Sequence, residues 1–218
     1  MKITLYYFDL PFWRAEVSRL ALYIGNIPFI DYRINDDEYK IFKIEGELPS
    51  KKIAPFKQLP VLEVDDKIFS QTGTIARYCG KLSELYPLNN DYEAALIDQI
   101  LEASQDINYM VTLSSRDKDN DKKKLAREIL ARKHLPKMFQ FLENLISNNH
   151  DSVWFVGKKI SIADLAIWRL LGWLSSGKLD GVPKDILDPY KNLLKLRKEV
   201  YQHPKVHEWM LTKYDKVI

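Results

Sequence analysis

The residue types that most often carry chemistry, cysteine and histidine, are few in this chain. Cys79 is the single cysteine of 218 residues, so neither an internal disulfide, a zinc ribbon nor a CxxC redox pair is available. It lies on the apolar face of an expected helix, which favours a small core residue over a nucleophile. His203 and His207 are four apart, but Pro204 suits a first helical position, so His203 precedes that helix. No third ligand is visible, and we expect no metal site.

Two polar clusters stand where helices are expected to begin. Ser161 and Asp164 precede an apolar run with the spacing of a capping box, in which Asp replaces the usual Glu. We therefore expect Asp164 to serve folding rather than catalysis. Gln71 and Thr72 also begin an expected helix, where free N–H groups and the helix dipole attract an anion. Thr72 could be a cap alone or a ligand as well.

Two tyrosines, Tyr6 and Tyr7, close an apolar run at the start of the chain. Either phenol could donate a hydrogen bond to a bound group. Residue types alone favour a plainer interpretation, in which both rings pack in the core of a sheet.

Changes of periodicity indicate the elements that must position these residues. An apolar run followed by helical spacing and a second short run predicts a parallel βαβ unit, and two short runs around Asp65-Asp66 predict a hairpin. The expected elements are a strand over 2–8, a helix from about 13 to 24, a strand over 29–33, a loop with one short helix over 36–54, hairpin strands 61–64 and 67–69, and a helix over 71–85.

The rest of the chain shows only helical spacing. Two long helices are expected on either side of the charged stretch 116–124, followed by the capped helix after Ser161. The fold class is therefore α/β plus all-α, with a βαβ-ββα layer before a helical domain. We place the first domain at residues 1–82, a linker at 83–91 and the helical domain at 92–218.

Composition excludes several classes of function. The chain has 33 Lys+Arg against 30 Asp+Glu, a net charge of +3, and neither half is strongly basic, so nucleic acid is not an expected partner. No apolar run reaches the roughly 20 residues of a membrane span, and the N-terminal residues do not resemble a secretory signal. We expect a soluble cytoplasmic protein without a membrane partner.

Three local sequences in this order resemble the cytosolic glutathione transferases, most closely their sigma class, which includes prostaglandin D synthase-like members. They lie over nearly the whole chain: Tyr6-Tyr7-Phe8 with Arg14-Ala15-Glu16, then 56–62 with 70–78, then Phe155-Val156-Gly157 before 161–164. The resemblance implies a thioredoxin-like first domain. One departure is the turn Pro11-Phe12-Trp13, which is one residue longer than the family pattern.

The resemblance also implies a glutathione site. Tyr7 would donate a hydrogen bond to the glutathione sulfur, with Tyr6 as the alternative donor, and a cis Leu59-Pro60 bond after Gln58 would pair with the cysteinyl backbone. The resemblance implies that Gln71 and Thr72 bind the γ-glutamyl carboxylate of glutathione and that Asp106 of a second subunit binds the γ-glutamyl amine. It implies that Lys51 or Lys52 binds the glycyl carboxylate, with Arg14 as a more distant helper.

The implied activity is conjugation of the glutathione thiolate with apolar electrophiles, by a homodimer that needs glutathione as co-substrate and no metal. From their location we expect the electrophile pocket to be lined by Phe12, Trp13, Met110 and Leu113. If Phe12 and Trp13 stood over the sulfur, flat or small electrophiles or an isomerisation would be favoured. Two alternatives stay open: a glutathione-dependent isomerase of the prostaglandin D synthase type, and a non-catalytic, crystallin-like member of the fold.

Overall fold

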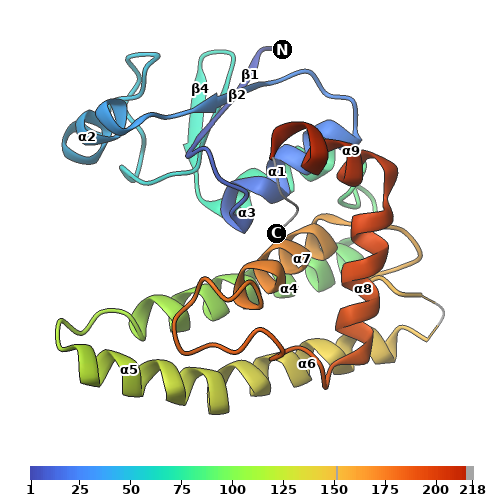
Figure 1. Ribbon diagram of the computed structural model, residues 1–218. Helices are drawn as coiled ribbons and strands as arrows, with labels where there is room; N and C mark the ends of the chain where they lie inside the picture. Colours follow the sequence, from blue (N-terminus) through green and yellow to red (C-terminus); the bar gives the residue numbers. More distant parts are fainter. Residues whose placement is uncertain (151, 215–218) are drawn as a thin grey trace.

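The computed structural model describes residues 1–150 and 152–214. Its first part is a sheet covered by helices, as the sequence predicts (Figure 1). The elements there are β1 (Ile3–Tyr7), α1 (Trp13–Ile24), β2 (Ile30–Arg33), α2 (Asp36–Glu45), β3 (Val61–Val64), β4 (Lys67–Ser70) and α3 (Thr72–Leu82). The expected short helix within 36–54 is α2, and α3 ends three residues earlier than predicted, at Leu82.

The sheet has the order β2-β1-β3-β4, with β1 parallel to β2 and antiparallel to β3. This confirms the βαβ unit and the hairpin. Thr4 lies opposite Glu63 on β3, and Tyr6 lies opposite Tyr32 on β2. Because side chains alternate between the two faces of a strand, Tyr6 shares the face of Thr4 and Glu63, and Tyr7 lies on the other face.

The second part consists of helices joined by turns and bends, with no strand among the described residues, which confirms the fold class. Its elements are α4 (Asp91–Leu113), α5 (Asn120–Ile129), a π-helical segment (Leu130–His134), α6 (Leu135–Asn148), α7 (Ile162–Leu174), α8 (Lys191–Gln202) and α9 (Pro204–Lys213). The segment 83–90 between the two parts consists of turns and bends. The exact domain limits stay a prediction.

The two parts pack through helices rather than through the sheet. In Figure 1, α1 and α3 lie between the sheet and α4 and α7, and α8 leads back to α9 beside α1. Contacts between α1 and α7 and between α1 and α9 agree with this arrangement. The turn after β1 and one end of α4 are thereby brought to the same side of the molecule.

The capped start of α7 confirms the folding role expected for Asp164. Its carboxylate is fully buried and accepts hydrogen bonds from the Ser161 N–H at 2.7 Å, the Ser161 hydroxyl at 2.8 Å and the Phe155 N–H at 2.9 Å. Burial raises the pKa of Asp164 to about 6, and these hydrogen bonds oppose the shift. Cys79 is also buried, as predicted, and burial raises the pKa of its thiol to about 12.

Candidate functional site

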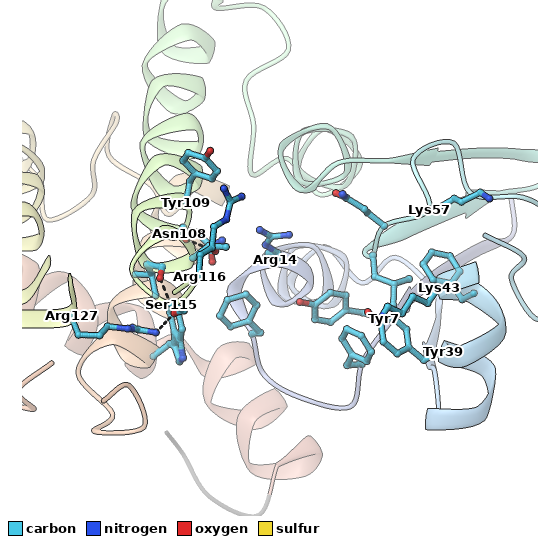
Figure 2. Close-up of a pocket in the computed structure, with 18 residues that line it drawn as sticks. Tyr7, Arg14, Tyr39, Lys43, Lys57, Asn108, Tyr109, Ser115, Arg116 and Arg127 are labelled. Carbon is cyan, nitrogen blue, oxygen red and sulfur yellow. Dashed lines mark hydrogen bonds between the residues drawn. The ribbon is translucent and has the colours of Figure 1, made fainter. Parts of the chain in front are cut away.

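Tyr7 ends β1 beside a cavity at the edge of the first domain. Its side chain is largely buried, with 5% of the residue exposed, and its hydroxyl has no hydrogen-bond partner within residues 1–150 and 152–214. Burial raises the pKa of Tyr7 to about 12, although the charges of Arg14 and Arg19 oppose this. The phenol therefore keeps its proton at neutral pH and can donate it in a hydrogen bond. Figure 2 shows Tyr7 between Arg14 and Tyr39.

Tyr6 lies on the opposite face of the sheet and does not line this cavity. Its hydroxyl donates to Glu63 at 2.9 Å, and its ring packs against Tyr32 with centroids 5.2 Å apart. Lys52 donates to the same Glu63 carboxylate at 2.9 Å. Tyr6 and Lys52 thus both bind Glu63, on the face of the sheet opposite Tyr7.

The large cavity has a volume of about 790 Å³ and lies between the first domain and the helices. One end has aromatic and basic residues from α2, and the other has polar and basic residues from the C-terminal end of α4 and from α5 (Figure 2). Its walls are formed by Tyr7, Phe8, Phe12, Arg14, Tyr39, Phe42, Lys43, Lys57, Gln58, Leu59, Asn108, Tyr109, Val111, Thr112, Ser115, Arg116, Arg127 and Trp173.

A second, small pocket of about 20 Å³ adjoins the first, because Arg14, Gln58 and Leu59 line both. It is lined by six of the ten residues that the resemblance implied for glutathione. Its walls are Arg14, Gln58, Leu59, Pro60, Ser70, Gln71, Thr72 and Gln105. The structure therefore brings Tyr7, Arg14 and the loop residues expected for glutathione to one continuous site.

The backbone of the small pocket has the features expected of a ligand-binding loop. The Leu59-Pro60 bond is cis, as the resemblance implied. Gln71 has φ 79°, a conformation that L-residues rarely adopt and that occurs most often at ligand sites. Thr72 follows as the first residue of α3, where the N–H groups of the first turn are free to bind an anion.

The two lysines expected at the glycyl carboxylate are not brought to either cavity. Lys51 is exposed and pairs with Glu47 at 2.8 Å, and Lys52 binds Glu63 as described above. Lys43 and Lys57 line the large cavity instead. A signal for Lys43 was present, since Tyr39, Phe42 and Lys43 recur at the spacing of one helix face.

Asp106 is exposed on α4 and lines neither cavity of its own chain, whereas its neighbour Gln105 lines the small pocket. The role expected of Asp106 concerns the site of a second subunit, so it stays a prediction.

Of the four residues expected around the electrophile, Phe12 alone lines the cavity, where its ring packs edge-on against Trp173 at 5.0 Å. Trp13 is fully buried and donates from Nε1 to the Asn108 side chain at 3.2 Å, so it joins α1 to α4. The residues of α4 that line the cavity are Asn108, Tyr109, Val111 and Thr112. Met110 and Leu113 do not line it.

The longer turn at Pro11-Phe12-Trp13 is held by two buried arginines. Arg19 donates to the carbonyls of Phe8 and Leu10, each at 3.0 Å. Arg169 of α7 donates to the Pro11 carbonyl from Nε at 3.1 Å and from Nη2 at 2.6 Å. These bonds fix the backbone that carries Phe12 beside Tyr7.

Within the part of the chain that the structure describes, no helix has the length and apolar character needed to cross a bilayer. Residues 1–150 and 152–214 contain no group of three or more His, Cys, Asp or Glu side chains arranged to hold a metal ion.

Comparisons with known proteins agree over both parts of the chain. Residues 3–81 match the family model "Glutathione S-transferase, N-terminal domain", and residues 105–213 match "Glutathione S-transferase, C-terminal domain". The chain is 32% identical over 198 residues to the hematopoietic prostaglandin D synthase of Gallus gallus, covering 90% of this chain and 89% of that protein. It is 33% identical over 177 residues to a glutathione S-transferase of Plasmodium falciparum (isolate 3D7), covering 77% and 78%. The solved structure of prostaglandin synthase D of Nilaparvata lugens has a TM-score of 0.83 at 27% identity and covers 98% of this chain and 99% of that one.

Proposed function

Because the chain belongs to the glutathione S-transferase family, we propose that it joins the thiolate of glutathione to apolar electrophiles, with Tyr7 as the hydrogen-bond donor to the sulfur. The observation that carries this proposal is the largely buried Tyr7 side chain, which lines the large cavity together with Arg14 and Leu59, two residues that also line the small pocket. Glutathione is the co-substrate, and no step requires a metal.

The energetics of thiol ionisation support a single donor. A free thiol has a pKa near 8.5, and a reduction of about 2 units takes about 2.7 kcal/mol. A hydrogen bond to an ionised group contributes about 1.5–3 kcal/mol. The donor must also stay protonated, and the raised pKa of Tyr7, about 12, meets that condition.

The surrounding groups suit the rest of the tripeptide. In this proposal the Leu59 backbone pairs with the cysteinyl residue, and Gln71 and Thr72 bind the γ-glutamyl carboxylate at the start of α3. We assign the glycyl carboxylate to Lys43 and Lys57, because they line the cavity and Lys51 and Lys52 do not. A homodimer, in which the partner's Asp106 meets the γ-glutamyl amine, and a cytoplasmic location are further parts of the proposal.

Two alternatives within the fold follow from the comparisons and from the turn. An isomerase acting on a prostaglandin endoperoxide is favoured by the relatives named prostaglandin D synthase. The turn beside Tyr7, which differs from the family pattern, is the feature that favours a non-catalytic, crystallin-like role. Turnover of a general electrophile separates the non-catalytic alternative from an enzyme, and an endoperoxide assay separates the two enzymes.

The proposal is tested by conjugation of chlorodinitrobenzene with Tyr7→Phe and with Tyr6→Phe as the matched control. We expect Tyr7→Phe to lower kcat about 25-fold at pH 7, because a thiol pKa two units higher reduces the thiolate fraction from about 76% to about 3%, with glutathione binding nearly unchanged. Tyr6→Phe removes a phenol that faces away from the cavity and should stay within about twofold of the parent. Retained turnover in Tyr7→Phe would remove Tyr7 as the donor, and tight glutathione binding without any conjugation by the parent would favour the crystallin-like role.

A further inference from the structure

A buried arginine stands at one end of the large cavity without enough partners. Arg127, on α5, is 7% exposed and lines the cavity. Its Nη2 donates to the Ser115 hydroxyl, while Nε and Nη1 have no hydrogen-bond partner among the described residues. Guanidinium is always charged, and the three N–H donors of Nε and Nη1 have no acceptor within the described residues. Burial of an unpaired charge costs free energy unless an anion binds to it.

The side chain is held in position rather than free to turn towards solvent. Ser115 donates to the Val111 carbonyl at 3.1 Å, which orients its oxygen towards Arg127. Gly181, at φ 76°, lies against the stem, since a Cβ there would come within 3.0 Å of the Arg127 Cβ. Asp180 is the carboxylate whose charge reaches Arg127, but the two form no ion pair within the described part of the chain.

The charge of the cavity wall points to an anionic ligand. Its lining residues include five cations and no carboxylate. Lys43 and Lys57 lie at one end, and Arg14 stands near Tyr7, in positions suited to the two carboxylates of glutathione (Figure 2). Arg127 and Ser115 lie at the opposite end, beyond Arg14 as seen from Lys57. An anion at Arg127 would therefore belong to the second substrate.

We infer that Arg127 binds a carboxylate of the electrophile, so that the enzyme prefers apolar electrophiles with an acidic group remote from the reactive carbon. The inference rests on the proposed function and names its substrate class. The aromatic pair Phe12 and Trp173 would pack against the apolar body between the two ends. With an enone, the glutathione sulfur bonds to the β-carbon, the alkene electron pair moves to form an enolate, and a proton from water completes the α-carbon.

The test compares ethacrynic acid, an enone with a carboxylate, with its methyl ester. We expect Arg127→Gln to raise KM for the acid about 10- to 100-fold, as for loss of a charged hydrogen bond, with kcat nearly unchanged. The ester, chlorodinitrobenzene and glutathione should keep their KM values. Arg132→Gln is the matched control, since it removes an equal charge from an exposed site on the adjoining π-helical segment.

A second comparison does not depend on folding of the variant. In the parent enzyme, the preference for acid over ester should be present at low salt and shrink as ionic strength rises. No preference in the parent, or an equal loss for acid and ester in Arg127→Gln, would overturn the inference. If the parent still conjugates chlorodinitrobenzene after either of these results, the proposed function stands although the inference about Arg127 fails.

If the parent conjugates no electrophile, the proposed function fails. Calorimetry of ethacrynic acid with the parent and with Arg127→Gln then decides the anion site. Weaker binding to the variant supports the anion site, and equal binding overturns it.

Discussion

At the scale of the residue, Thr72 was expected either to cap α3 alone or to bind a ligand as well, and Gln71 proves to be the N-cap. The Thr72 hydroxyl lies at the first position of α3 and the Thr72 side chain lines the small pocket. No hydrogen bond of that hydroxyl is found within residues 1–150 and 152–214, so capping does not account for it. This favours the ligand role that the sequence left undecided.

We expect Thr72→Val, which keeps the shape and removes the hydroxyl, to raise the glutathione Kd about tenfold by calorimetry, the loss of one hydrogen bond to a carboxylate. Thr74→Val, two residues along α3 and exposed, should leave the Kd unchanged. Equal Kd values for parent and Thr72→Val would assign that carboxylate to backbone N–H groups alone.

The two tyrosines illustrate what residue types could not decide. The sequence predicted the strand that carries them, but which phenol faces the ligand depends on the face that the helices cover. In the fold, Tyr6 and Tyr7 lie on opposite faces of the sheet: the Tyr6 hydroxyl donates to Glu63, and Tyr7 lines the cavity. Pairing with the same Glu63 takes Lys52 out of the site, and local sequence carries no signal for it.

At the scale of elements, periodic patterns predicted the helices and strands well but not the faces they present. Helix α4 was expected, yet the residues through which it lines the cavity are 108, 109, 111 and 112 rather than 110 and 113. Arg127 and Trp173 were missed because α5 and α7 reach the site only through tertiary packing. Leu59-Pro60 and Gln71-Thr72 were located correctly because the hairpin of β3 and β4, which is local structure, brings its two ends together.

The start of α7 makes a prediction about stability and pH. Asp164→Asn should lower the free energy of unfolding by about 1–3 kcal/mol at neutral pH, because buried donors on Ser161 and Phe155 lose their acceptor. In the parent, the pKa of Asp164 is raised from 3.8 to about 6. The folded protein therefore binds more protons than the unfolded chain between these values, and this group's contribution to stability falls as pH rises from 4 to 6.

The difference in stability between parent and Asp164→Asn should thus be larger at pH 4 than at pH 7, measured by urea unfolding at both. Asp188→Asn, an exposed carboxylate, is the control and should show no such change. A difference that widens towards pH 7 would mean that the carboxylate is stabilised in its charged form.

At the scale of the whole molecule, the proposed homodimer can be tested by mixing two impaired variants. Asp106 lines neither cavity of its own chain, so its proposed role requires a second subunit. In a hybrid of Tyr7→Phe and Asp106→Asn subunits, one site would combine an intact Tyr7 with the intact Asp106 of its neighbour.

We expect exchange of equal amounts of the two variants to restore about one quarter of parental conjugation at low glutathione, since half of the dimers would be hybrids with one intact site of two. Mixed subunits that have not exchanged provide the control. Activity no higher than the average of the separate variants would place Asp106 outside the partner's site.

The central claim is that the Tyr7 hydroxyl makes the sulfur of bound glutathione anionic at neutral pH. Ultraviolet titration of the thiolate in the binary complex tests it most directly, and Tyr7 itself will not interfere because its pKa is about 12. We expect the bound thiol to ionise about 2 pH units below the free value of about 8.5 in the parent, and near the free value in Tyr7→Phe. A bound thiol that ionises in the parent at the same pH as free glutathione would contradict the account.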